Sequence, residues 1–301
     1  MKIKTRRYYI YYLGKMFFWL ISLIPLKISL KIADFLGKTV CRLVPKYRQI
    51  AIDNLNMVFS DNLEGNVRIA ENVFSNLAKN GAEWVKLSVM DPKKFDDVVT
   101  ETEGLERLDK VLTAGRGAVV LGFHFGNWEL LGFALRSRGY KGALIARRIY
   151  FHKYDKFVNR LRARFDARVI YREESPKRML RELKEGGILG VLADQDIDSI
   201  GGTFVNFFGK GAYTPQAPVK IAMAAKTQIV PIFIVRKKDN THKLIVENII
   251  DVAGTDNTEE NVNHYTQVWT NVLEKYVRKY PEQWVWLHKR WKTEKPERNN
   301  I

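Results

Sequence analysis

A histidine and a glutamate with four residues between them could form a proton-transfer pair in the stretch LGFHFGNWELLGFAL. On one continuous helix the side chains of His124 and Glu129 would point about 140° apart, because each residue turns about 100°. Across a turn from a strand into a helix they can converge. A carboxylate beside an imidazole fixes its tautomer and stabilises its cation, so His124 could act as a general base that Glu129 orients.

The residues between this pair predict the turn itself. Gly126 permits a tight bend of the backbone, and Asn127 is a favourable N-cap for a helix that begins at Trp128. The first N–H groups of that helix would face a developing negative charge. For the His-x4-Glu spacing alone, the alternative is a structural histidine at a strand end and a glutamate that favours a helix start.

Basic residues also follow other apolar segments, where a ligand could meet them. Arginine binds phosphate or carboxylate through two parallel hydrogen bonds. Arg147 and Arg172 stand at the ends of predicted strands and are therefore candidates for binding an anionic ligand. Arg148 follows Arg147 directly. The basic residues from Lys153 to Arg168 could instead form a solvated helix face; they are Lys153, Lys156, Arg160, Arg162, Arg164 and Arg168.

A further polar group, Asp194-Gln195-Asp196, ends another apolar segment. Two carboxylates could suggest Mg²⁺, but no third ligand is evident in the sequence. The other interpretations are a part in the architecture of the site or a contact with the acceptor, and ordinary capping and turn chemistry. We therefore predict no metal site.

Alternating apolar and amphipathic segments predict the elements that must position these side chains. The predicted strands are 118–123, 142–146, 168–171, 188–193, 229–235 and 244–250. The predicted helices are 64–89, 128–138, 154–165, 176–185, 215–226 and 259–280. This order is typical of an α/β fold with a mostly parallel sheet between helices, and the last two strands are expected to add an antiparallel edge. Ligands bind beyond the carboxyl ends of strands in such sheets.

The composition excludes several classes of protein. The chain has 301 residues, and its 50 Lys and Arg outnumber its 33 Asp and Glu, which gives a net charge of +17. With 46% hydrophobic residues it can bury an ordinary core, which excludes disorder over most of its length. The lone Cys41 excludes an internal disulfide and a cysteine-cluster metal site, and we expect it to be a small buried side chain. The mean hydropathy of −0.26 excludes a polytopic membrane protein.

The amino-terminal residues predict a local membrane contact. A basic segment with Lys2, Lys4, Arg6 and Arg7 precedes the apolar run YYIYYLGKMFFWLISLIPL. The run barely reaches the roughly 20 residues that a spanning helix needs. Basic residues on both sides favour an interfacial hairpin of two helices in the cytoplasmic leaflet, and a helix packed on the body of the protein is the alternative. We assign residues 1–48 to membrane-anchoring helices and 49–301 to the α/β domain.

Several ordered motifs resemble the bacterial lipid A late acyltransferases, the lauroyl and myristoyl acyltransferase type, within the broader glycerolipid or lysophospholipid acyltransferase-like group. They are YRQIAIDNLNMVF, GLERLDKVLTAGRGAVVLGFHFGNWEL, VLADQD, NFFG and PEQWVWLHKRWK. The resemblance runs from about residue 10 to residue 292. The family usually shows an Arg-Pro pair where this chain has Arg147 followed by Arg148. Arg147 therefore matches the arginine, and Arg148 departs from the pattern at the proline.

The resemblance implies transfer of a fatty acyl chain from a thioester, on acyl carrier protein or coenzyme A, to a hydroxyl of a lipid A precursor-type glycolipid. His124 would be the base and Glu129 would orient it, with no cofactor. The resemblance assigns Asp194 and Gln195 to the rim of the site, and we add Gly126, Asn127, Arg147 and Arg172 as substrate-binding candidates. It implies a place on the cytoplasmic face of a bacterial inner membrane. The stretch 201–211 would be a loop over the acyl pocket or simple aromatic packing.

Two other functions remain open. The acceptor could be a phospholipid or a phosphatidylinositol mannoside. A non-catalytic basic protein that binds lipid or nucleic acid is the alternative from another class, although no DNA- or RNA-binding motif is visible, so we predict no specific nucleic-acid partner. His288 belongs to a motif of the family but lies far from His124 in the sequence. Trp284, Trp286 and Trp291 are expected to pack or to lie at the interface, and we favour a structural role.

Overall fold

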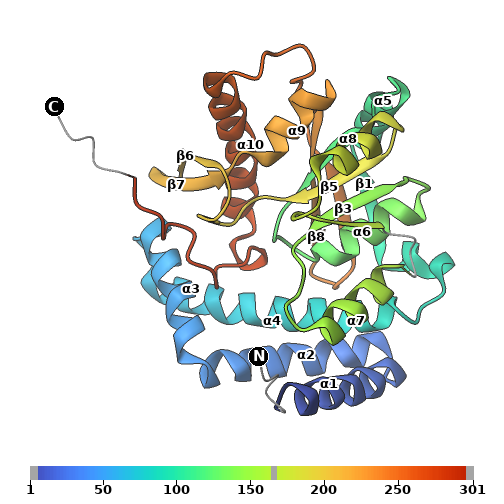
Figure 1. Cartoon of the computed structure of the whole chain (residues 1–301). Helices are drawn as coiled ribbons and strands as arrows, with labels where there is room; N and C mark the ends of the chain where they lie inside the picture. Colours follow the sequence, from blue (N-terminus) through green and yellow to red (C-terminus); the bar gives the residue numbers. More distant parts are fainter. Residues whose placement is uncertain (1–5, 164–167, 296–301) are drawn as a thin grey trace.

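A seven-stranded sheet forms the centre of the chain in the computed structural model, which describes residues 6–163 and 168–295 (Figure 1). Its strand order is β1-β9-β8-β2-β5-β3-β4, and neighbouring strands are parallel except β8 and β9. The strands are β1 (Val99–Glu103), β2 (Ala118–Gly122), β3 (Gly142–Ala146), β4 (Arg168–Tyr171), β5 (Ile188–Leu192), β8 (Ile229–Arg236) and β9 (His242–Val246). The expected α/β fold with a mostly parallel sheet is confirmed.

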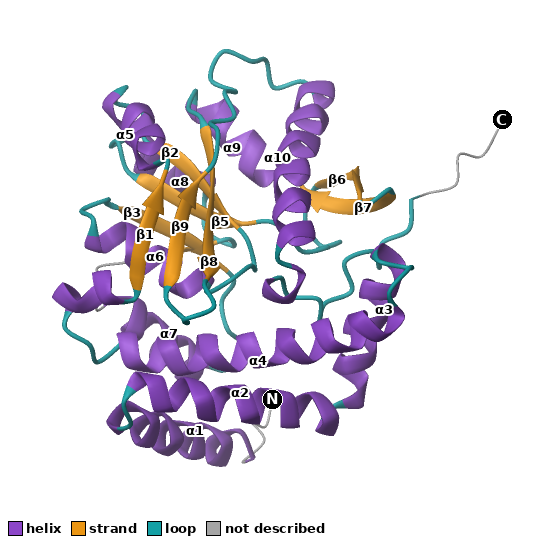
Figure 2. Ribbon diagram, turned by 180° about the vertical axis from the view of Figure 1, so that it is seen from behind, coloured by secondary structure: helices purple, strands orange, loops and turns teal. Residues whose placement is uncertain are grey.

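Helices cover both faces of this sheet because its central strands are apolar on both sides. Ala118 and Val120 of β2 pack with α5 (Leu105–Thr113) and α6 (Trp128–Ser137). Val119 and Leu121 face the other way, toward α8 (Pro176–Lys184), α9 (Ala217–Ala225) and α10 (Glu259–Lys279). Successive residues of a strand point to opposite faces, so a strand between two helical layers must be apolar throughout. Figure 2 shows the helices on either side of the strands.

Two details of the predicted fold are wrong. The antiparallel pair of β8 and β9 exists, but β9 is not the edge, because β1 pairs with it in parallel. The segment VTETE of β1 is mostly exposed and polar, so it lacks the apolar signal of a strand. The stretch 201–211 is not a loop: it forms most of an antiparallel hairpin of β6 (Gly202–Phe207) and β7 (Lys210–Pro215), and Phe207 and Phe208 at its end are buried.

A layer of four helices lies along one end of the sheet: α1 (Arg6–Leu23), α2 (Leu26–Leu43), α3 (Pro45–Val58) and α4 (Leu63–Leu87) (Figures 1 and 2). Helix α2 packs closely on α4 at Gly37, which has no side chain. A Cβ atom there would lie only 2.6 Å from the carbonyl oxygen of Phe74. Cys41 is completely buried between them, as expected. The predicted boundary at residue 48 falls within α3.

The other faces of α1 and α2 expose large apolar side chains, among them Tyr9, Leu13, Met16, Phe17, Trp19, Leu23, Phe35 and Leu43. Among the described residues, no helix combines the length and the apolar character that crossing a bilayer requires. Lys2 and Lys4 lie outside the described residues. The short helices η1 (Pro92–Asp97), α7 (His152–Ala163) and η2 (Pro281–Gln283) complete the fold.

Candidate active site

The register of two neighbouring strands brings His124 to Asp194. In the parallel pair of β2 and β5, Gly122 lies opposite Leu192, so the residues two positions further on also lie opposite each other. The Nδ1 atom of His124 is 2.8 Å from Oδ1 of Asp194. The backbone N–H of His124 also donates to Oδ2 of Asp194 at 3.0 Å. A single carboxylate therefore holds both the ring and the backbone of His124.

The C-terminal segment completes the surroundings of Asp194. The indole Nε1 of Trp284 donates to Oδ2 of Asp194 at 2.9 Å, and the backbone N–H of Val285 donates to the carbonyl of His124 at 3.1 Å. Trp284 and Trp286 are fully buried, which confirms their expected structural role. Asp194 itself is fully buried and its oxygens bond inside the protein, so the structure agrees with a role in the architecture of the site, and the expected contact with substrate stays a prediction.

Glu129 does not hydrogen-bond to His124. Its carboxylate lies against the guanidinium of Arg162 on α7, with Nε 3.1 Å from Oε2 and Nη2 2.5 Å from Oε1. The expected hydrogen-bonding role of Glu129 is therefore taken by Asp194. The turn does bring Glu129 close enough for its charge to favour the imidazolium of His124.

Burial and Asp194 have opposite effects on His124. Burial disfavours the imidazolium and is the largest single influence, but the charge and hydrogen bond of Asp194 outweigh it, so the pKa of His124 is raised above its ordinary value. For Asp194, burial disfavours the anion, but the charge and hydrogen bond of His124 overcome this, so the pKa of Asp194 is held well below its usual range. The two groups thus favour an imidazolium beside a carboxylate, which is the state that a base reaches after taking a proton.

The backbone turn between His124 and α6 is tight, as predicted. Gly126 has φ +56°, and a Cβ there would lie 1.8 Å from the carbonyl oxygen of Ile234, so this position requires glycine. Asn127 is the N-cap: its Oδ1 accepts from the N–H of Leu130 at 3.2 Å. Its Nδ2 donates to Glu83 and the residue is 2% exposed. Both residues are buried and serve the turn, and the expectation that Gly126 and Asn127 bind substrate stays a prediction.

The two arginines follow the next strands of the same sheet edge. Arg147 follows β3 and Arg172 follows β4, and Ala146 pairs with Tyr171 just before them. Arg147 is exposed, whereas Arg172 lies 3.1 Å from Oε1 of Glu173. His124, Asp194, Arg147 and Arg172 thus follow four neighbouring strands, β2, β5, β3 and β4. Gln195 is half-buried beside Asp194.

Most other basic residues of this region have partners inside the protein. Arg148 lies over the ring of Tyr171 at 4.0 Å, and Arg168 pairs with Glu182 at 2.6 Å. Lys153 lies over the rings of three tyrosines of α1 and donates to the hydroxyl of Tyr12. Arg164 lies outside the described residues. The solvated-face interpretation therefore fails for Arg162 and Lys153, although the sequence alone carries no signal of these pairings.

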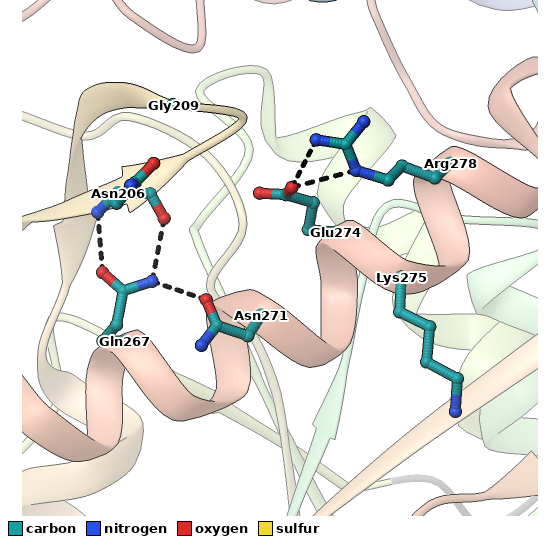
Figure 3. A pocket seen from close by; sticks show the side chains of 7 residues that line it. All are labelled: Asn206, Gly209, Gln267, Asn271, Glu274, Lys275 and Arg278. Carbon is teal, nitrogen blue, oxygen red and sulfur yellow. Dashed lines mark hydrogen bonds and ion pairs between the residues drawn. The ribbon is translucent and has the colours of Figure 1, made fainter.

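No group of three potential ligands among His, Cys, Asp and Glu forms a metal site within the described residues. A separate polar groove lies between the β6–β7 hairpin and α10 (Figure 3). Its side chains largely bond to one another: Gln267 bonds to the backbone of Asn206 and Glu274 pairs with Arg278. None of the predicted site residues lines this groove, so it is not the candidate active site.

Comparisons with known proteins agree with the resemblance seen in the motifs. A family model for bacterial lipid A biosynthesis acyltransferases matches residues 1–293. The lipid A biosynthesis lauroyltransferase of Escherichia coli (strain K12) is 27% identical over 299 residues, 95% of this chain and 92% of that protein. The lipid A biosynthesis myristoyltransferase of the same strain is 25% identical over 277 residues, 92% of this chain and 84% of that protein. The phosphatidylinositol mannoside acyltransferase of Mycobacterium tuberculosis (strain CDC 1551 / Oshkosh) is 29% identical over 132 residues, 42% of each chain.

Proposed function

The chain belongs to the bacterial lipid A biosynthesis acyltransferase family, and we propose that it transfers a fatty acyl chain from a thioester to a hydroxyl of a lipid A precursor-type glycolipid. The donor is an acyl chain on acyl carrier protein or coenzyme A. The family match over nearly the whole chain supports the reaction class. The hydrogen bond between His124 and Asp194 is the observation that carries the mechanism.

In this mechanism His124 removes the proton from the acceptor hydroxyl while the oxygen attacks the thioester carbonyl. The tetrahedral intermediate then loses its C–S bond, and the leaving thiolate takes the proton back from His124. No acyl-enzyme is needed and no cofactor takes part. The geometry supports this role because Nδ1 of His124 is held by Asp194, which leaves Nε2 for the substrate, and the His124 side chain is 22% exposed. A positioned base contributes about 10²–10⁴-fold to such a rate.

The two carboxylates near His124 have different proposed roles. Asp194 fixes the tautomer of His124 by a direct hydrogen bond, as the buried carboxylate of a catalytic triad does. Glu129 acts through its charge and holds Arg162 at the site. Arg147 and Arg172 are proposed to bind phosphates of the acceptor, since they follow strands next to those that carry His124 and Asp194.

We propose further that the exposed apolar faces of α1 and α2 insert into the cytoplasmic leaflet of the inner membrane. The exposed aromatic and aliphatic side chains of these helices support this, as do the exposed Lys15, Lys27 and Lys31 among them. A cosedimentation assay with vesicles of anionic phospholipid tests it. The double variant Leu13→Glu/Phe17→Glu should lose vesicle binding at an unchanged melting temperature, and unchanged binding would contradict the proposal.

The reaction is tested by incubating the full chain in membranes with labelled acyl carrier protein or coenzyme A thioesters and candidate acceptors, followed by mass spectrometry of the lipids. The acceptors should include a lipid A precursor, a phospholipid and a phosphatidylinositol mannoside. We expect an acylated lipid A precursor from the wild type and loss of product with His124→Ala. Retained lipid binding without any acylated product from the wild type would favour the non-catalytic alternative.

A further inference from the structure

A buried group of charged and polar side chains lies directly behind the catalytic turn. We call Glu83, Arg236, His242, Asn80 and Asn127 the Glu83 cluster; each is no more than 9% exposed. Arg236 holds both carboxylate oxygens of Glu83, and Nε2 of His242 lies 3.0 Å from Oε1. Residues from α4, the turn, β8 and β9 therefore meet at one carboxylate. None of them has a part in the proton transfer described above.

The Glu83 cluster bonds to the turn at two successive residues. Nδ2 of Asn80 donates to the carbonyl of Gly126 at 2.6 Å, and Nδ2 of Asn127 donates to Oε2 of Glu83 at 2.7 Å. Nη2 of Arg236 also donates to Oδ1 of Asn80 at 2.7 Å, which fixes the amide that reaches the turn. The backbone from Gly126 to Asn127 is thus attached to α4.

A third connection runs through Gln283. The N–H of Gly126 donates to the backbone carbonyl of Gln283 at 2.8 Å. The side chain of Gln283 in turn bonds to both the N–H and the carbonyl of Arg236, at 2.8 and 2.9 Å. The residues that follow Gln283 are those that hold Asp194 and the carbonyl of His124. The Glu83 cluster therefore reaches both partners of the His124–Asp194 pair.

Taking a carboxylate, a guanidinium and an imidazole out of water is costly, and an apolar group of similar volume often fills such a space without loss of stability. The Glu83 carboxylate does one thing that an apolar side chain cannot do: it accepts the amide hydrogen of Asn127, which leaves Oδ1 of Asn127 turned to the first turn of α6. This orients the helix start that follows His124.

We propose that Glu83 is a positioning residue of the acyl transfer. Through Asn127 and Asn80 it holds the turn so that Nε2 of His124 faces the substrate while Nδ1 stays on Asp194. This inference rests on the proposed function, since it assigns Glu83 to the same site. A small displacement of a catalytic base can cost about 10²-fold in rate. The loss should appear in kcat and not in KM, because Glu83 does not reach the substrate.

The main test is the double variant Glu83→Leu/Arg236→Met, which removes both charges and fills the space with apolar atoms. We expect kcat to fall by about 10²-fold, with KM within a few-fold of the wild type. The matched control is Glu182→Leu/Arg168→Met, which removes another ion pair with a buried carboxylate, between α8 and β4, away from the turn. That control should keep the wild-type kcat.

A second variant covers the case in which the double variant does not fold. Asn127→Ser keeps a hydroxyl that can cap α6 but loses the amide that reaches Glu83. We expect it to lower kcat as well, while Glu83→Gln, which still offers an oxygen to Asn127, should retain most of the activity. Wild-type kcat in Asn127→Ser and in the double variant would overturn the proposal.

An NMR titration of the His124 ring separates this proposal from the proposed function. If Glu83 positions His124 on Asp194, the titration midpoint of His124 should move toward its ordinary value in the double variant and stay in place in the Glu182→Leu/Arg168→Met control. If the wild type shows no acyl transfer but the double variant still shows this shift, the proposed function is refuted, and the role of Glu83 in positioning His124 is retained. An unchanged midpoint together with unchanged kcat would refute the positioning role alone.

Discussion

The two sides of the catalytic turn differ in how completely their polar groups are paired. On the inner side the Glu83 cluster is closed to solvent, and its hydrogen bonds run between charged and amide groups, with only Nδ1 of His242 lacking a partner. On the outer side the His124 ring is partly exposed, and neither ring nitrogen of His288 has a hydrogen-bond partner among the described residues. Among the described residues, the polar groups on the inner side are thus almost fully paired, whereas the outer side leaves the His124 ring partly exposed and both ring nitrogens of His288 unpaired.

The pKa values on the two sides follow the same division. On the inner side, burial opposes the anion of Glu83, but the charges of His242 and Arg236 outweigh it and hold the pKa of Glu83 well below its usual range. On the outer side, burial lowers the pKa of His288 to about 4; the charge of Asp194 acts against this, and the charges of His124 and Arg290 act in the same direction as burial. His288 is therefore a neutral imidazole next to a dyad that favours a charged one.

The largest effect should come from the carboxylate on the outer side. Asp194→Asn removes the anion that stabilises the His124 imidazolium and leaves the ring free to take the other tautomer. We expect kcat to fall by about 10²–10⁴-fold, the share of a positioned base. Single-turnover acyl transfer measures it.

The neighbouring carboxylate is the matched control. Asp196 is also buried, but it bonds to the backbone and hydroxyl of Thr293. Asp196→Asn should keep kcat within a few-fold. Equal losses of kcat in Asp194→Asn and Asp196→Asn would contradict a specific role of Asp194, because any buried carboxylate of this region would then have the same effect.

Gly126→Ala should strain the turn between the two sides and destabilise the protein. The added methyl group would meet the carbonyl of Ile234, and a positive φ is strained for alanine. We expect the free energy of unfolding to fall by about 1–3 kcal/mol. Denaturant unfolding gives the value.

Gly132 of α6 offers the contrasting site, because a Cβ there meets no atom within 4 Å. Gly132→Ala should be neutral or stabilising by about 0.5–1 kcal/mol, since alanine favours a helix interior. A Gly126→Ala protein as stable as the wild type would show that the turn is not under the restraint we describe.

The pH dependence of activity should report the state of His124. As the proposed base, His124 would work when it is neutral. Activity should then rise with pH through its pKa, which Asp194 and Glu129 raise above the ordinary value against the effect of burial. In Asp194→Asn the residual activity should rise at lower pH than in the wild type. A plot of kcat/KM against pH for both proteins tests this, and identical midpoints would contradict the assigned pairing.

The last prediction concerns stability in mild acid. The unfolded chain protonates His288 near pH 6.5, whereas the folded chain does so only near pH 4, so His288 should cost stability as pH falls through this window. The loss is of the order of 3 kcal/mol. His124 acts in the opposite direction: its raised pKa contributes stability below pH 6.5 that is lost as pH rises through that pKa. As pH falls from 7 to 4, the melting temperature of His288→Gln should decline less than that of the wild type. Parallel declines in the two proteins would show that His288 makes no such contribution.

Local features of this chain could be predicted from the sequence alone. Apolar runs predict the central strands, and Gly126 with Asn127 predicts the bend and the helix start, because these depend on neighbouring residues. Each of the motifs that resemble the family is likewise contiguous. The polar strand β1 was not predictable, because its few apolar contacts come from its place beside β9.

The partners of the reactive groups were decided only by the tertiary structure. Asp194 is 70 residues from His124, Arg162 is 33 residues from Glu129 and Glu83 is 44 residues from Asn127. The sequence showed that these side chains are charged or polar, but which of them meet depends on strand order, parallel register and the packing of α4 against the sheet edge. Those are outcomes of burying the whole apolar surface at once, and no spacing along the chain encodes them.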